Sequence, residues 1–243
     1  MRRLGQPERD AKLSEMLRQQ QEHCFGTYGY RRMWQWLKNN GIRRNPKTVL
    51  RIMRKYGLLS EIRRRRKWTQ MGQQVHKYEN LLNRNFRADR PNTKWVTDIS
   101  YIHTGQGILY LSMIRDLYDN SIVAYKASSY QTLTLVLDTI RIAIKSERAA
   151  AELQLHSDQG FPYTSQAYFN LTQEYGITPP SMSRRGNCYD NAMAAPFFSI
   201  LKTECIYRCK PANFAQANEM IHRFIHFYNH ERIQAKTGEA PLA

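Results

Sequence analysis

Two aspartates stand where strand-like runs would present them for phosphoryl-transfer chemistry. Asp98 lies inside the run Trp95-Val-Thr-Asp-Ile-Ser-Tyr, and Asp158 follows the alternating run Leu153-Gln-Leu-His. Alternation of this kind predicts half-buried strands. Carboxylates are ligands for Mg²⁺, and two such ions can activate a water or a 3′-hydroxyl and stabilise the leaving oxygen. A lone strand-end aspartate is more often a turn residue, so the hypothesis depends on the pair.

The elements around this pair predict an α/β fold. Strands are expected over residues 95–103, 108–115, 121–128 and 153–156, with 176–180 as a connector or a short fifth strand. Helices are expected over 132–148 and 165–175, and largely from 190 onward. This order predicts an RNase H-like sandwich, a mixed five-stranded sheet flanked by helices. In that fold the fourth strand lies beside the first, so the two carboxylates should converge.

Positive charge is concentrated at the front of the chain. The formal net charge is +17, and residues 1–90 hold 23 basic and 7 acidic side chains, which leaves a net of +1 for the remainder. Such a front predicts a nucleic-acid partner whose binding weakens with salt.

No apolar run approaches the roughly 20 residues that span a bilayer, and no secretory signal precedes residue 8, so a cytoplasmic, nucleoid-associated location is expected. The four cysteines are expected to be reduced thiols.

The basic front predicts a helix-turn-helix. A polar helix is expected over residues 8–22, followed by a helix with Met33, Trp34 and Leu37 inward. Asn45 and Pro46 predict the cap and first turn of a second helix over 46–56, with Val49, Leu50 and Met53 inward. In a helix-turn-helix the second helix enters the DNA major groove. The competing interpretation is a helical hairpin with a solvated basic face.

The expected domains are an N-terminal helix over 1–24, a helix-turn-helix domain with a basic tail over 25–68, a linker over 69–91 and a catalytic core over 92–243. The expected contacts with double-stranded DNA involve one tyrosine, one threonine and the basic residues of both domains: Tyr30, Arg31, Arg32, Lys47, Thr48, Arg51, Arg54, Lys55, Arg63, Arg64, Arg65, Arg66, Arg184, Arg185 and Lys202.

Three ordered motifs carry a resemblance to a known family. They are Trp95-Val-Thr-Asp98-Ile-Ser-Tyr, His156-Ser-Asp158-Gln-Gly and Ser181-Met-Ser-Arg-Arg-Gly-Asn-Cys-Tyr-Asp190-Asn-Ala. The chain resembles bacterial insertion-sequence transposases with a retroviral-integrase-like (DDE) core, over about residues 25–243. The resemblance implies strand cleavage and 3′-hydroxyl strand transfer at terminal inverted repeats, with two Mg²⁺ ions or Mn²⁺ held by Asp98 and Asp158. It also implies a second-reading-frame portion, an upstream-frame partner, target DNA and a homo-oligomer on DNA.

The chain departs from the family pattern at the third acid. Where the family has Asp-Asn-Ala-x-x-Glu-Ser-Phe-Phe, this sequence has Asp190-Asn-Ala-Met-Ala-Ala195-Pro-Phe-Phe. Ala195 therefore occupies the catalytic glutamate position, and we expect poor cleavage. Three interpretations stay open: a deliberate inactivation, a decayed copy, or a functional chain in which Glu204 or Asp190 substitutes. The last is weak, because Glu204 lies about 13 Å further along a helix and Asp190 is expected to cap one.

Two other interpretations stand beside the transposase. The first is a catalytically dead DNA-binding repressor or assembly subunit, which Ala195 favours. The second is an RNA-directed nuclease of the ribonuclease H type, which the helix-turn-helix disfavours. Separately, the spacing of Cys205, Cys209, His222 and His226 is compatible with a zinc site. The apolar residues among the histidines favour an amphipathic helix there instead.

Overall fold

The computed structural model describes residues 10–60, 78–147, 152–177, 180–184, 190–191 and 193–243. The chain forms two compact units. One contains the N-terminal helices together with residues 230–241, and the other contains the sheet and its helices up to Asn229. None of the helices in the described part of the chain is long and apolar enough to cross a membrane.

A five-stranded mixed sheet forms the centre of the second unit, with the strand order β3-β2-β1-β4-β5. β1 (Lys94–Thr104), β2 (Gly107–Asp116) and β3 (Ile122–Ser128) are antiparallel neighbours. β4 (Gln154–Ser157) runs parallel to β1, and β5 (Ser181–Met182) runs parallel to β4. The predicted fourth strand therefore lies beside the first, and the short fifth strand begins just beyond residues 176–180.

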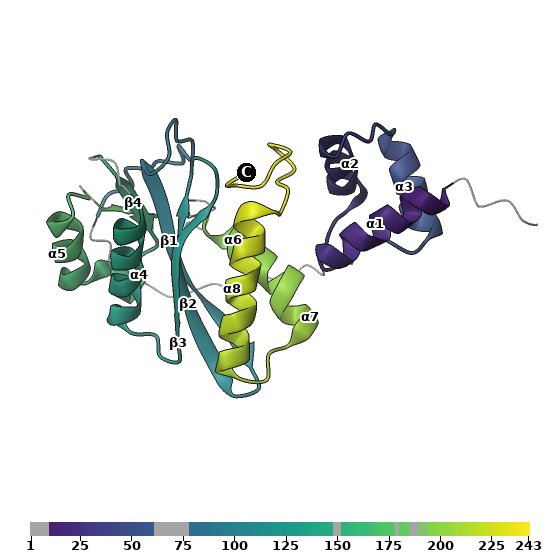
Figure 1. Cartoon of the computed structure of the whole chain (residues 1–243). Helices are drawn as coiled ribbons and strands as arrows, with labels where there is room; N and C mark the ends of the chain where they lie inside the picture. The colour runs from purple at the N-terminus through teal and green to yellow at the C-terminus, as the bar shows by residue number, and fades with distance from the viewer. Residues whose placement is uncertain (1–9, 61–77, 148–151, 178–179, 185–189, 192) are drawn as a thin grey trace, which may run out of the picture. The chain divides into compact units, whose positions relative to one another are not determined.

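Helices cover both faces of this sheet (Figure 1). α4 (Leu133–Ser146) and α5 (Gln166–Glu174) lie on one face, with the short η1 (Phe161–Thr164) between β4 and α5. α6 (Ala195–Leu201), η2 (Lys202–Ile206), α7 (Tyr207–Cys209) and α8 (Phe214–His230) follow, and α6, α7 and α8 lie on the other face. The core against α4 includes Trp95 and Leu155 from the strands and Val136 and Ile140 from the helix. The α/β sandwich predicted from the element order is confirmed.

The first unit contains three short helices, α1 (Ala11–His23), α2 (Tyr30–Asn39) and α3 (Pro46–Lys55). As predicted, the Asn45 side chain caps α3 by accepting a hydrogen bond from the Lys47 amide at 2.8 Å. The buried residues of α3 are Val49, Ile52 and Met53. Leu50, which was expected to point inward, is only half-buried. The apolar face of α3 is therefore rotated slightly from the predicted one.

Residues that follow α8 complete the first unit. The Ile233 amide donates to the Tyr28 hydroxyl at 2.7 Å, and the Asn39 side chain donates to the Gly238 carbonyl at 2.9 Å. Tyr28 is fully buried, and burial raises the pKa of its hydroxyl to about 12. The domain boundaries expected from the sequence assign all of 92–243 to the catalytic core, whereas the structure groups 230–241 with the N-terminal helices.

We expect Tyr28→Phe to destabilise the first unit. The substitution leaves the buried Ile233 amide without its acceptor, which costs about 1–3 kcal/mol. Hydrogen exchange of the α2 amides would measure the loss. Tyr30→Phe is the matched control, because the Tyr30 hydroxyl accepts only an exposed hydrogen bond from Arg31 among the contacts of that side chain in the described structure. An equal effect of the two substitutions would contradict the role of Tyr28.

Candidate active site

The register of two parallel strands brings Asp98 and Asp158 together. Val96 of β1 pairs with His156 of β4, so Asp98, within β1, and Asp158, the residue directly after β4, lie at corresponding positions two residues further along the chain. Alternate residues of a strand point to the same face. Trp95 and Ile99 point toward α4, so Asp98 faces the opposite side, which α6 and α8 cover. The convergence of the two carboxylates follows from strand order alone.

Burial perturbs both acids, and the charge of Asp158 adds to its effect on Asp98. Burial, followed by the charge of Asp158, raises the pKa of Asp98 to about 7. The Ile99 amide, which donates to Asp98 Oδ1 at 2.8 Å, and the Lys202 ammonium oppose that rise. Burial also raises the pKa of Asp158, against a hydrogen bond from the Gly160 amide at 2.9 Å. The pair therefore retains a proton at a pH where isolated aspartates have lost it.

Two neighbours of the pair were not predicted from the sequence. A Cβ on Gly160 would lie 2.9 Å from Asp158 Oδ1, so only glycine leaves this carboxylate in place. Tyr163 is buried with its hydroxyl 3.3 Å from the Thr97 hydroxyl, and burial and both aspartates raise its pKa. The spacing Asp-x-Gly is a local signal for the first neighbour. No local signal marks the second.

The donor set at this position fits a magnesium site. Two carboxylates supply hard oxygen ligands, and the negative charge of Asp158, which contributes to the raised pKa of Asp98, would also attract a cation. Mg²⁺ is commonly held by one or two carboxylates, with substrate phosphates and waters completing its shell. Within the described ranges, however, no three His, Cys, Asp or Glu side chains gather as a metal-binding group. The acids therefore stand as a pair.

Ala195 is the first residue of α6 and is exposed. Pro196 lies in the first turn of this helix, where proline is tolerated. Lys202 follows seven residues after Ala195, which is two helical turns, and therefore lies on the same side. The Lys202 ammonium donates to the Ser100 hydroxyl at 2.6 Å, which ties the end of α6 to the strand that carries Asp98.

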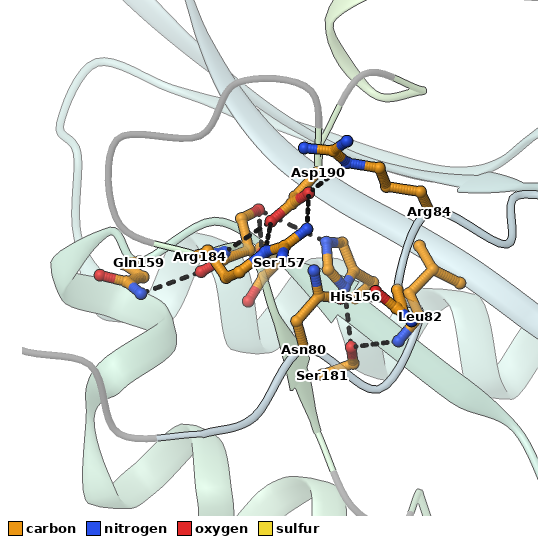
Figure 2. Close-up of polar contacts among 11 residues, drawn as sticks. Asn80, Leu82, Arg84, His156, Ser157, Gln159, Ser181, Arg184 and Asp190 are labelled. Atoms are coloured by element: carbon orange, nitrogen blue, oxygen red, sulfur yellow. Dashed lines mark hydrogen bonds and ion pairs between the residues drawn. The ribbon is translucent and has the colours of Figure 1, made fainter.

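Asp190 does not cap α6, contrary to expectation. The helix begins after Ala194 without a side-chain cap, and the Asp190 carboxylate instead accepts hydrogen bonds from Arg184 and Arg84 (Figure 2). These arginines, Arg184 first, lower its pKa against the effect of burial. A carboxylate held by two guanidinium groups is poorly suited to replace the glutamate that the family pattern leads us to expect at position 195.

The predicted DNA-contacting residues fall into several groups. Lys47, Arg51, Arg54 and Lys55 are exposed on the side of α3 opposite its buried residues, while Thr48 is half-buried. Arg51 also pairs with Asp10 at 2.9 Å. On α2, Arg31 is exposed, Tyr30 and Arg32 are half-buried, and Arg32 lies over the Tyr28 ring. Arg184 is engaged with Asp190, Lys202 with Ser100, and the remaining predicted contacts lie outside the described residues: Arg63, Arg64, Arg65, Arg66 and Arg185.

The residues with zinc-like spacing do not gather at one point. Cys205 donates to the Met220 carbonyl at 3.8 Å, and burial raises the pKa of its thiol to about 12. His222 contacts the Tyr125 hydroxyl at 2.7 Å, and Cys209 is exposed. All four residues of this pattern belong to the described structure, and no three of them form a metal-binding group.

Comparison with known proteins assigns each of the two units to a protein family. An HTH-like domain family matches residues 7–66, and integrase core domain families match residues 88–188 and 196–243. Among solved structures, a chain of the simian T-cell lymphotropic virus intasome, in complex with a phosphatase regulatory subunit, superposes with a TM-score of 0.54. It is 16% identical, and the match covers 95% of this chain and 72% of the other. That likeness supports the fold.

The sheet, its paired aspartates and these matches define a protein with a helix-turn-helix-like domain and an integrase core. Sequence relatives narrow the class. InsK, described as a transposase of insertion sequence element IS150 of Escherichia coli, is 34% identical over all of this chain and 86% of its own length. A transposase-like protein of Haemophilus influenzae is 41% identical over 83% of this chain and 93% of its own length. The chain belongs to the family of bacterial insertion-sequence transposases.

Proposed function

We propose that this chain binds the terminal inverted repeats of an insertion sequence and carries an incomplete centre for strand cleavage and 3′-hydroxyl strand transfer. Asp98 and Asp158 are the two remaining acidic catalytic residues, and Ala195 stands in place of the third. The observation that carries the proposal is the placement of Asp98 within β1 and of Asp158 directly after the neighbouring β4, on the face where α6 begins at Ala195. Cleavage by the chain as it stands is impaired.

Each residue of the site has a separate task in this proposal. Asp98 and Asp158 would hold Mg²⁺, or Mn²⁺ in its place. When bound, the ions supply activation of the attacking oxygen and compensation of charge on the leaving oxygen. Lys202, beside Ser100, contributes a positive charge that attracts the scissile phosphate to the acid pair. Gly160 and Tyr163 keep the Asp158 side of the site in place.

The exposed basic side of α3 is the proposed DNA-reading surface. Lys47, Arg51, Arg54 and Lys55 recur at spacings of four, three and one residues, which places them along one side of the helix. Recognition helices of this kind contact base edges and phosphates in the major groove. The arginine run over 63–66 would add phosphate contacts.

We expect Lys47→Ala to weaken binding to any duplex and to lower the salt dependence. Removing one phosphate contact reduces the slope of log K against log[salt] by about 1. Fluorescence anisotropy with a labelled inverted-repeat duplex at several salt concentrations would measure both quantities. Lys145→Ala, at the end of α4, removes the same charge from an exposed position. A similar loss in both variants would show that only total charge matters.

The direct test of the proposal is a cleavage and strand-transfer assay with inverted-repeat DNA in Mg²⁺ or Mn²⁺. The unaltered chain should bind the duplex and yield little product. Full activity would overturn the proposal, and so would an absence of duplex binding.

The reaction acts on chromosomal DNA, in the bacterial cytoplasm, with target DNA as the second substrate. It would involve several copies of the chain on the DNA ends and the upstream-frame portion of the transposase.

A repressor or assembly subunit is the second candidate function, and Ala195 is the observation that favours it. Such a protein would occupy the same ends without cutting them. Replacing Ala195 by glutamate distinguishes the two candidate functions, because a chain specialised for binding gains no cleavage activity from a third carboxylate. The expected gain is argued in the Discussion.

A further inference from the structure

The Asp190 side chain is fully buried and is held by two arginines (Figure 2). Arg184 donates to Asp190 Oδ2 through its main-chain amide at 3.0 Å and through Nε at 2.8 Å, and to Oδ1 through an Nη at 3.1 Å. Arg84 donates to Oδ1 through its Nε at 3.0 Å. Hydrogen bonds between charged groups are stronger than neutral ones, and three of them, together with one from a main-chain amide, fix this carboxylate.

The three residues come from segments that are distant in sequence. Arg84 precedes β1, Arg184 follows β5, and Asp190 lies five residues ahead of α6. Arg84 has a φ of 62°, in the left-handed region that residues other than glycine seldom adopt. A strained backbone of this kind persists only where the surrounding structure holds it, and such residues cluster at functional sites.

The residues around Arg184 are also hydrogen-bonded to β4, the strand that ends directly before Asp158. The Ser183 amide donates to the Ser157 carbonyl at 3.0 Å, and the Gln159 side chain donates to the Ser183 carbonyl at 2.9 Å. His156, on β4, contacts the Ser181 hydroxyl at 2.8 Å and donates to the main-chain carbonyl of Asp190. Contacts with β4 and with Gln159 just beyond it therefore hold the chain ahead of α6 at two places, at Ser181 and Ser183 before Arg184 and again at Asp190.

α6 needs such attachments because its own sequence does not fix where it starts. It is seven residues long, and the residue before it, Ala194, offers no capping side chain. Outside the cluster, the Met193 carbonyl accepts a hydrogen bond from Arg115 of β2. The position of residue 195 relative to Asp158 thus depends on tertiary contacts on either side of Asp190.

We propose that Arg84 and Asp190 are positioning residues that hold residue 195 toward the acid pair, so that a carboxylate at 195 can join Asp98 and Asp158. This inference rests on the proposed function. It predicts a specific energetic coupling between Arg84 and position 195. A merely structural cluster would instead affect the chain equally whichever residue stands at 195.

A double-mutant cycle on the full chain tests this coupling, with Mn²⁺ binding as the readout. Ala195→Glu alone should raise Mn²⁺ affinity about tenfold or more. Adding Arg84→Ala should abolish that gain while leaving the weaker affinity of the Ala195 chain unchanged, since losses of supporting residues cost about 10–100-fold at metal sites. Arg84→Lys should retain part of the gain. Arg87→Ala is the control, because the Arg87 side chain forms only an exposed ion pair with Asp89, at 3.7 Å, among the residues described.

The outcomes separate the two proposals. Loss of the gain only in the Arg84→Ala background supports the positioning role, with thermal melting used to show that the chain remains folded. A gain that survives both Arg84→Ala and Asp190→Asn overturns the positioning role and leaves the proposed function intact. If Ala195→Glu gives no gain even with the cluster complete, both proposals fail together.

Discussion

Replacing Ala195 by glutamate is expected to raise strand cleavage and strand transfer by about a hundredfold or more. Removal of a single transition-state-stabilising group typically costs 10²–10³ in rate, and a missing metal-holding carboxylate belongs to that class. α6 already begins at residue 195, which is exposed, so the new side chain needs no space inside the core. Product formation on inverted-repeat DNA in Mg²⁺ and in Mn²⁺ measures the change.

Ala195→Gln is the matched control for this prediction, because glutamine has the size of glutamate but carries no charge. It should leave cleavage at the level of the unaltered chain. Equal gains from Gln and Glu would show that the effect comes from helix packing rather than from a carboxylate. If neither changes the rate, the repressor or assembly function becomes the better account of the chain.

The second large effect concerns pH and metal binding. The pKa of Asp98 is raised to about 7 in the folded chain without metal, so below pH 7 a proton occupies the carboxylate that a metal ion needs. Mn²⁺ affinity should therefore fall about tenfold for each pH unit below 7, or about a hundredfold from pH 7 to pH 5. Above pH 7.5 or so it should become constant. Calorimetric titration with Mn²⁺ across this range provides the measurement.

Asp98→Asn supplies the control for the pH dependence. The amide cannot hold that proton, so binding should be weak and nearly independent of pH around neutrality. An affinity of the unaltered chain that stays constant from pH 5 to pH 8 would mean that Asp98 is ionised throughout. That result would contradict the raised pKa that burial and the neighbouring charge of Asp158 give to Asp98.

The sheet and the acid pair could be predicted because their signals are local. Trp95, Val96 and Asp98 alternate as a strand requires, and Asp158 ends a second such run. The order of strands and helices then makes the two strands neighbours, which β1 and β4 are. The cap of α3 was predictable for the same reason, since Asn45 and Pro46 act on the turn that follows them.

The features that the sequence did not reveal depend on distant partners. Asp190 followed by Asn191 suggests a helix cap, but Arg84, 106 residues earlier in the chain, engages its carboxylate instead. Charge pairing of two guanidinium groups outweighed the modest gain from a cap. Likewise, the hydrogen bond from Ile233 to Tyr28 joins residues 205 positions apart, and no periodicity or motif marks either of them.

The grouping of residues 230–241 with the N-terminal helices has a consequence for synthesis. Domains generally fold as they emerge from the ribosome, N-terminal ones first. Here the contacts of Tyr28 and Asn39 form only after the whole integrase core has been translated. A nascent or truncated chain would therefore expose an incompletely packed N-terminal unit, and, if that unit binds the element ends as we propose, firm binding requires the completed chain.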